Sequence, residues 1–122
     1  MVLPRKNNLI VEKSDAFSDR IIKKMYKYLV DHHNDGVIAR QILKSGTSIG
    51  ANVAESRNAQ SRSDFVSKLS IALKEADETL YWLKKLLVME WIKPAHYESM
   101  ASDNEEIIKI LTKIIKTTKG IE

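Results

Sequence analysis

Apolar side chains recur at three- and four-residue steps in four successive segments of this sequence. That spacing places them on one face of a helix with 3.6 residues per turn. Glycine and proline, which interrupt helices, number only four and two in 122 residues. The clearest stripe contains Phe65, Leu69, Ala72, Leu73, Ala76, Leu80, Leu83 and Leu87. No strand pattern competes, so the sequence predicts an all-α fold, an antiparallel up-and-down four-helix bundle.

The apolar periods predict helices over residues 15–33, 37–58, 64–90 and 94–116. Ser14 or Asp15 can cap the first helix by accepting a hydrogen bond from its free amide groups. Ser61 or Ser63 can cap the third helix, where Asp64 suits the positive end of the helix dipole. The sequence thus predicts a single domain: an N-terminal arm at 1–12, the bundle at 13–118 and a tail at 119–122.

The start of the last helix allows two interpretations. Pro94 suits the first turn of a helix because its missing amide hydrogen is not needed there. Ser102 followed by Glu105 matches a capping box and would instead restart the helix after a short turn. The apolar period does not slip between these positions, so we expect one continuous helix from Pro94 to about Lys116.

Two pairs of residues are candidates for close helix packing or for an oligomer interface. Gly46 and Gly50 lie inside the second predicted helix, where each costs about 1 kcal/mol of helix propensity relative to alanine. With Ala54 they form a ridge of small residues, which predicts the close approach of another backbone. Trp82 and Trp91 are large anchors near the end of the third helix. They serve either packing between helices or a contact between subunits, where aromatic residues are enriched.

The sequence offers no pattern typical of a catalytic or metal centre. A di-iron bundle needs Glu-x-x-His motifs, and none occurs. Adjacent His32 and His33 point about 100° apart on a helix, so they suit a helix end better than a shared metal. Glu75 and Glu78 lie among other charges, which is typical of a solvated face. The chain has no cysteine and no phosphate-binding glycine loop. We therefore expect no enzyme activity, no metal and no cofactor.

The location of the protein is predicted from two absences in the sequence. The residues after Met1 contain no apolar segment of the kind found in signal peptides. The longest apolar run is Leu86 to Met89, whereas a membrane helix needs about 20 apolar residues. We expect a cytoplasmic protein that does not associate with a membrane.

The formal net charge is +4 and the pI is about 9.3, and the basic excess lies on the first two helices. Residues 13–33 contain five basic and three acidic side chains, and residues 37–62 contain four basic side chains against Glu55 alone. The basic residues late in the fourth helix, such as Lys113, need no explanation beyond the helix dipole. The candidate phosphate contacts are Lys23, Lys27, Arg40, Lys44, Arg57 and Arg62.

Two segments, Ser-Ile-Gly-Ala-Asn-Val-Ala-Glu at 48–55 and Ser-Ile-Ala-Leu-Lys-Glu-Ala at 70–76, carry a resemblance. The chain resembles, from Phe17 to Ile115, the bacterial four-helix bundle family named after 23S rRNA intervening sequences. Where that family often has Glu-Gly, this chain has Glu55-Ser56, and serine fits a helix better. The resemblance implies an up-and-down bundle and, as in several members, a ring-shaped homopentamer. It also relates the chain to accessory proteins of diversity-generating retroelements, which bind nucleic acid and a reverse transcriptase through a basic surface. For most members no function is established.

Two functional hypotheses follow. The first is a homo-oligomer that binds RNA or DNA through the basic surface of the first two helices. The second is a protein-interaction scaffold, for example for a reverse transcriptase, with no nucleic-acid role.

Overall fold

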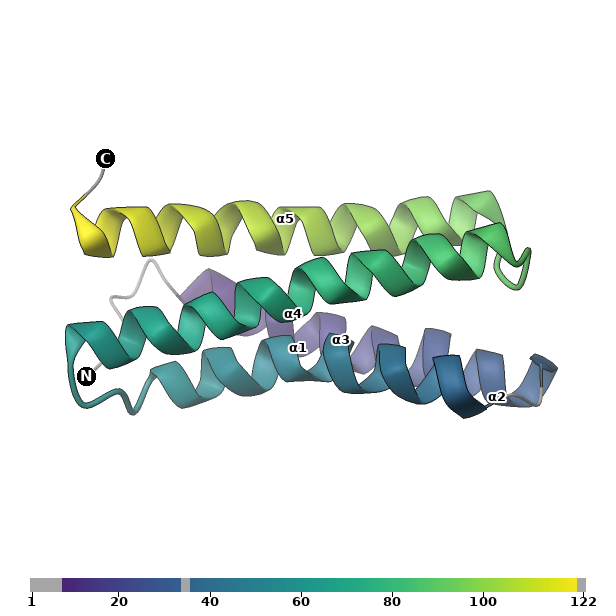
Figure 1. Ribbon diagram of the computed structural model, residues 1–122, viewed down its shortest axis with the longest axis horizontal. Coiled ribbons are helices and arrows are strands. Elements are labelled where there is room, and N and C mark those ends of the chain that lie inside the picture. Colours follow the sequence, from purple (N-terminus) through teal and green to yellow (C-terminus); the bar gives the residue numbers. More distant parts are fainter. Residues whose placement is uncertain (1–7, 34–35, 121–122) are drawn as a thin grey trace.

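The computed structural model describes residues 8–33 and 36–120 and confirms the predicted four-helix bundle (Figure 1). The first helical rod is made of α1 (Asn8–Arg20), the π-helical segment η2 (Ile21–Tyr26) and α2 (Lys27–His33). The other three helices are α3 (Gly36–Ser56), α4 (Arg62–Val88) and α5 (Pro94–Lys119). The described residues contain no strand.

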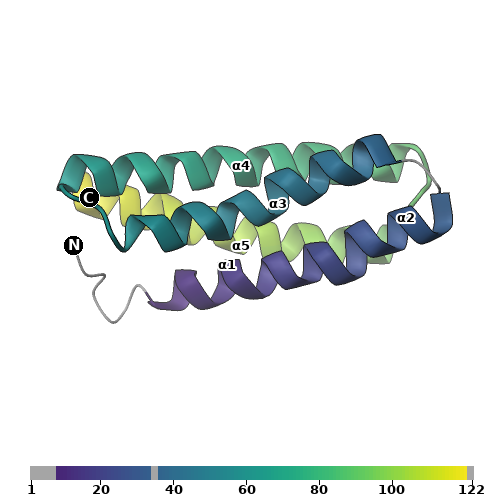
Figure 2. The same ribbon diagram turned by 90° about the horizontal axis from the view of Figure 1, so that it is seen from below.

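Successive helices lie side by side and run in opposite directions, as short connections require. The first rod contacts α3, α3 contacts α4, and α4 contacts α5. A smaller contact between α1 and α5 closes the ring of helices, as the view from below shows (Figure 2). The start of α1, the α3–α4 connection and the end of α5 therefore lie together at one end of the bundle (Figure 1).

The first helix begins earlier than the sequence predicts, so the expected arm at 1–12 is wrong for its last five residues. α1 starts at Asn8, and Ile10 is fully buried in the core. Ser14 is not a cap, because it is buried inside the helix and donates a hydrogen bond to the Val11 carbonyl at 3.3 Å. Ile10 lies two helical turns before Phe17, so it continues the buried stripe toward the N-terminus and adds a tertiary contact there. Residues 1–7 of the expected arm lie outside the described part of the chain.

The π-helical segment in the middle of the first rod keeps its apolar stripe aimed at the core. Ile21, Met25 and Leu29 follow one another at four-residue steps, and all three are fully buried. In a regular α-helix each such step would rotate the side chain about 40° farther around the axis. The wider π turn of η2 takes up this rotation, because it uses more residues per turn.

The connection between α3 and α4 has a defined hydrogen-bonded geometry. Ser61 is the cap of α4 and accepts a hydrogen bond from the Asp64 amide at 3.0 Å. The Asp64 carboxylate accepts one in return from the Gln60 amide at 3.2 Å. This reciprocal pair resembles a capping box. Ser61 and not Ser63 is therefore the cap, and α4 begins at Arg62, two residues earlier than predicted.

The last helix is continuous, as predicted, and does not restart at Ser102. Pro94 lies in its first turn, and the helix runs to Lys119, three residues beyond the predicted Lys116. Gly120 ends it with a φ of 75°, a left-handed conformation that glycine adopts without strain. The predicted tail at 119–122 is thus shorter by at least one residue, and residues 121–122 lie outside the described part of the chain.

A polar layer crosses the otherwise apolar core near the middle of the bundle. The hydroxyl oxygens of Ser45 on α3 and Thr79 on α4 lie 3.0 Å apart, and both residues are fully buried. Asn104 on α5 is also fully buried and donates from Nδ2 to the Ala76 carbonyl at 2.8 Å. Because a shifted helix would break these bonds inside the core, the layer favours one register of α3, α4 and α5.

Candidate nucleic-acid interface

All six predicted phosphate contacts are exposed, and none forms an ion pair with another described residue. They occupy η2 and the start of α2 (Lys23, Lys27), α3 (Arg40, Lys44), and the α3–α4 connection with the start of α4 (Arg57, Arg62). Among the described residues, the ion pairs involve only Lys13 and Arg20 as cations. The six side chains are therefore available to bind an anion.

The structure separates these six cations into two groups along the bundle axis. Gly46 of α3 lies against Ile21 of the first rod. Since the two helices are antiparallel, this contact places Lys23 and Lys44 near the middle of the bundle, with Lys27 and Arg40 toward the α2 end. Arg57 and Arg62 lie at the other end, about 20 Å farther along the axis of α3. A single short oligonucleotide would not reach both groups on one protomer without following the length of the rod.

The sequence reasoning missed three lysines that belong beside Arg57 and Arg62. The last residues of α5 reach the end of the bundle where α4 begins (Figure 1). These residues are Lys113, Lys116 and Lys119, and all are exposed. Their late position in the helix was explained by the helix dipole alone. The signal that could have found them is the up-and-down topology, which brings residues 113–119 next to residues 57–62.

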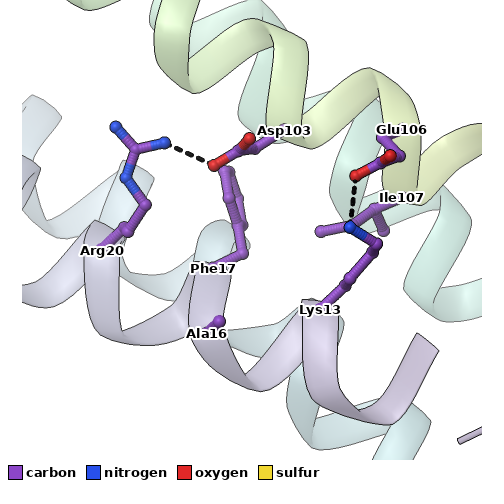
Figure 3. A pocket seen from close by; sticks show the side chains of 7 residues that line it. All are labelled: Lys13, Ala16, Phe17, Arg20, Asp103, Glu106 and Ile107. Atoms are coloured by element: carbon purple, nitrogen blue, oxygen red, sulfur yellow. Dashed lines mark hydrogen bonds and ion pairs between the residues drawn. The ribbon is translucent and has the colours of Figure 1, made fainter. Parts of the chain in front are cut away.

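The cations on the α5-facing side of α1 serve the fold instead. Lys13 Nζ lies 2.7 Å from Glu106 Oε1, and Arg20 forms a short ion pair with Asp103 (Figure 3). Arg20 also donates to the Ser99 hydroxyl at 3.0 Å. The bond to Glu106 raises the pKa of Lys13, which stays charged. These contacts tie α1 to α5 and leave both cations neutralised.

The two ion pairs border a small recess on the α1–α5 seam. Its volume is about 120 Å³, and Phe17 and Ile107 line its apolar part (Figure 3). Pockets that hold cofactors or drug-sized ligands measure roughly 300–1,000 Å³. The recess is therefore too small for such a ligand.

Gly46 and Gly50 allow the close approach that the sequence predicts, and the partner is the first rod of the same chain. A Cβ atom on Gly46 would lie 2.7 Å from Ile21 Cγ1. One on Gly50 would lie 2.9 Å from Ser18 Oγ and 3.2 Å from the Ser14 carbonyl oxygen. The predicted ridge does not continue to Ala54, which is exposed.

The two tryptophans have different environments. Trp91 lies in the α4–α5 turn, where its ring stacks on His33 with centroids 4.6 Å apart and planes 7° apart. His33 Nε2 donates to the Trp91 carbonyl at 3.2 Å, so this tryptophan packs within the chain. Trp82 is half-buried on α4 and donates from Nε1 to the Glu78 carboxylate at 3.2 Å.

The three histidines meet around Tyr28 at the end of the bundle opposite Arg57. His32 stacks on the Tyr28 ring at 4.3 Å, and His96 meets the same ring edge-on at 5.7 Å. His32 and His33 form the last turn of α2, in agreement with a role at a helix end. Partial burial, and then the nearby Arg20, lower the pKa of His96. The described residues contain no group of three or more ligands able to hold a metal ion.

Glu75 and Glu78 have different environments on α4. Glu78 is exposed and accepts the bond from Trp82, and Glu75 is half-buried beside α3. Burial raises the pKa of Glu75, with a further contribution from the charge of Glu78. The charges of Lys44 on α3 and of Lys74 oppose that rise in the pKa.

The fold defines the class: a small all-helical bundle with a buried polar layer and exposed basic side chains. The chain belongs to the 23S rRNA-intervening sequence protein family, whose model matches residues 6–113. It is similar to a solved structure from Bacteroides thetaiotaomicron, described as a protein of unknown function from the S23 ribosomal protein family. The two share 51% identity with a TM-score of 0.86, over 88% of this chain and 98% of that one. No catalytic family is indicated by these matches.

No curated protein matches the chain. Of the helices in the described part of the chain, none is both long enough and apolar enough to cross a membrane.

Proposed function

We propose that this protein is a non-enzymatic, homo-oligomeric accessory protein that binds RNA. The observation that carries the proposal is the set of exposed cations at the end of the bundle where α3 meets α4 and α5 ends. These are Arg57, Arg62, Lys113, Lys116 and Lys119, none of which forms an ion pair with a described residue. The family's link to 23S rRNA intervening sequences supports RNA as the polyanion.

The physical basis of this binding is the release of counterions from the phosphate backbone. Each cation that neutralises a phosphate frees condensed counterions, so affinity falls steeply as salt rises. Assembly would multiply the effect, because every copy adds the same basic end to one particle. A homopentamer is the assembly that the family resemblance implies, and mass measurement by light scattering tests it.

The proposal is tested with a fluorescently labelled structured RNA titrated with protein at several salt concentrations. Replacing Arg57, Arg62, Lys113 and Lys116 by glutamine should reduce the salt slope by roughly one unit for each lost phosphate contact. The control replaces Lys84 and Lys93, which are exposed at the opposite end, by glutamine. Equal binding by the first variant and wild type, or no binding at low salt, would contradict the proposal.

A protein-interaction scaffold remains the second candidate, and one observation favours it. Tyr81 and Val88 are 53% and 75% exposed on α4, two helical turns apart on one face. Exposed apolar side chains at helical spacing suit a partner helix. A reverse transcriptase retained on the immobilised protein after nuclease treatment, and lost in a Tyr81→Ser, Val88→Ser variant, would support this function instead.

A further inference from the structure

We propose that a second copy of this chain places the outer face of its first rod against the α3-facing side of α4. The inference rests on the homo-oligomeric part of the proposed function and names the two surfaces that meet. One is the acidic stripe of α4: Lys68, Ile71, Glu75, Glu78, Trp82, Lys85 and Met89. The other is the basic stripe of the first rod: Asp19, Ile22, Lys23, Tyr26, Lys27, Val30 and Asp31.

The acidic stripe follows one side of α4, because its members are separated by three or four residues or by sums of these steps. Ile71 and Met89 are 41% and 37% exposed, and Trp82 is half-buried. Large apolar side chains thus remain partly in contact with solvent along this side. Between Ile71 and Trp82 lie Glu75 and Glu78, and partial burial, followed by the charge of Glu78, raises the pKa of Glu75.

The basic stripe lies on the solvent side of the first rod. Ile22 and Val30 are 44% and 41% exposed, eight residues apart, and Tyr26 between them is half-buried. Lys23 and Lys27 are exposed between the two aliphatic side chains and pair with no described carboxylate. The stripe therefore offers apolar anchors around a positive centre.

The order of charges along the two stripes is complementary. The first rod reads acid, base, base, acid at Asp19, Lys23, Lys27 and Asp31. The stripe on α4 reads base, acid, acid, base at Lys68, Glu75, Glu78 and Lys85. Because each pattern is symmetric about its centre, the helices can meet in either direction with opposite charges facing. Such matching at an interface selects the partner and disfavours contact between two like stripes.

The contact joins two different surfaces of the chain, so it is heterologous. A heterologous contact leaves one free stripe of each kind on every dimer, and further copies add until the rotation closes a ring. The contact differs from a two-fold dimer, in which both unlike pairs of stripes would have to meet at a single interface. It also assigns Lys23 and Lys27 to the neighbouring subunit, and leaves the RNA to the end that carries Arg57 and Arg62.

The test is a charge swap followed by light scattering without RNA. The variants Lys23→Glu with Lys27→Glu, and Glu75→Lys with Glu78→Lys, should each weaken assembly roughly a hundredfold or more, because like charges then face each other. A chain carrying all four substitutions should assemble again, since the reversed stripes match. The control reverses Lys84 on α4 and Lys109 on α5, which are exposed and belong to neither stripe.

Circular dichroism establishes that each variant is folded. If a reversed variant does not fold, Lys23→Gln with Lys27→Gln and Glu75→Gln with Glu78→Gln replace it, and each should weaken assembly without adding repulsion. Folded reversed variants that assemble like wild type would overturn the inference, and so would a folded four-fold variant that stays monomeric. A wild type that is monomeric throughout defeats both the inference and the homo-oligomer proposal, whereas the contribution of Arg57 and Arg62 to RNA binding is measured separately in the salt titration.

Discussion

The first rod has two neighbours in the bundle, and the two seams are held in different ways. Against α3, Ile21 fits over Gly46, and the Ser14 carbonyl lies where a Cβ of Gly50 would approach it. Against α5, the Lys13–Glu106 and Arg20–Asp103 pairs span the edge of a small recess. Steric fit therefore determines how the first rod packs against α3, whereas partly exposed ion pairs stabilise its contact with α5.

The largest expected effect comes from filling the α3 seam. Gly46→Val should lower the free energy of unfolding by roughly 3 kcal/mol, because the added atoms meet the stiff, β-branched Ile21 inside a packed core. Urea denaturation followed by circular dichroism measures the change. Ala51→Val on the exposed side of α3 is the matched control, and it should cost less than about 1 kcal/mol. Similar losses for the two variants would show that shape does not govern this seam.

The α5 seam should respond more weakly and in a salt-dependent manner. Lys13→Gln and Arg20→Gln should each cost at most about 1 kcal/mol, since the side chains are partly exposed and exposed ion pairs contribute little. The same denaturation experiment at low and at high salt separates charge from packing. The difference from wild type should shrink at high salt because the charges are screened. The comparison would be contradicted if either variant lost as much unfolding free energy as Gly46→Val, or if its loss were the same at low and at high salt.

The smallest expected effect is a pH dependence at the same seam. The pKa of His96 is lowered in the folded protein by burial and by Arg20. The folded state therefore binds this proton less readily than the unfolded chain does, and stability decreases as the pH falls below the ordinary histidine pKa of about 6.5. The decrease should end once the pH has passed the lowered pKa of the folded state.

Comparing urea midpoints of wild type and His96→Gln at pH 7.5 and 5.5 measures this contribution. The variant should lose less stability between the two values, because it has no imidazole to protonate. An identical change of the urea midpoint with pH in the two proteins would show that His96 does not cause the loss of stability.

The parts of the fold that sequence predicted well are those whose signals are local. The α4 cap, which the sequence narrowed to Ser61 or Ser63, and Pro94 in the first turn of α5 are both set by residues within one turn. The start of the first helix failed because the burial of Ile10 depends on distant partners. The stripe on α4 shifted for the same reason: Leu73, Leu80 and Leu87 are half-buried, whereas Thr79 and Leu86 are fully buried.

For the candidate surfaces, too, local features were predictable and features that depend on distant contacts were not. Exposure of Lys23, Arg40 and Arg57 followed from their place opposite the apolar stripes. Their separation into two groups did not, because it depends on which helices run antiparallel. The role of Lys13 and Arg20 as ties to α5 likewise needed partners more than 80 residues away in the chain.

By itself, the sequence determined that this protein is a bundle of four amphipathic helices without the ligand pattern of a di-iron centre or a cysteine site. Apolar period, capping residues and the absence of cysteine act locally or by composition, so no neighbour has to be known. Only the tertiary structure decided where helix one begins, which cations are neutralised and which lysines gather at one end. Those outcomes depend on contacts between residues far apart in the sequence, and such contacts exist only once the helices have packed.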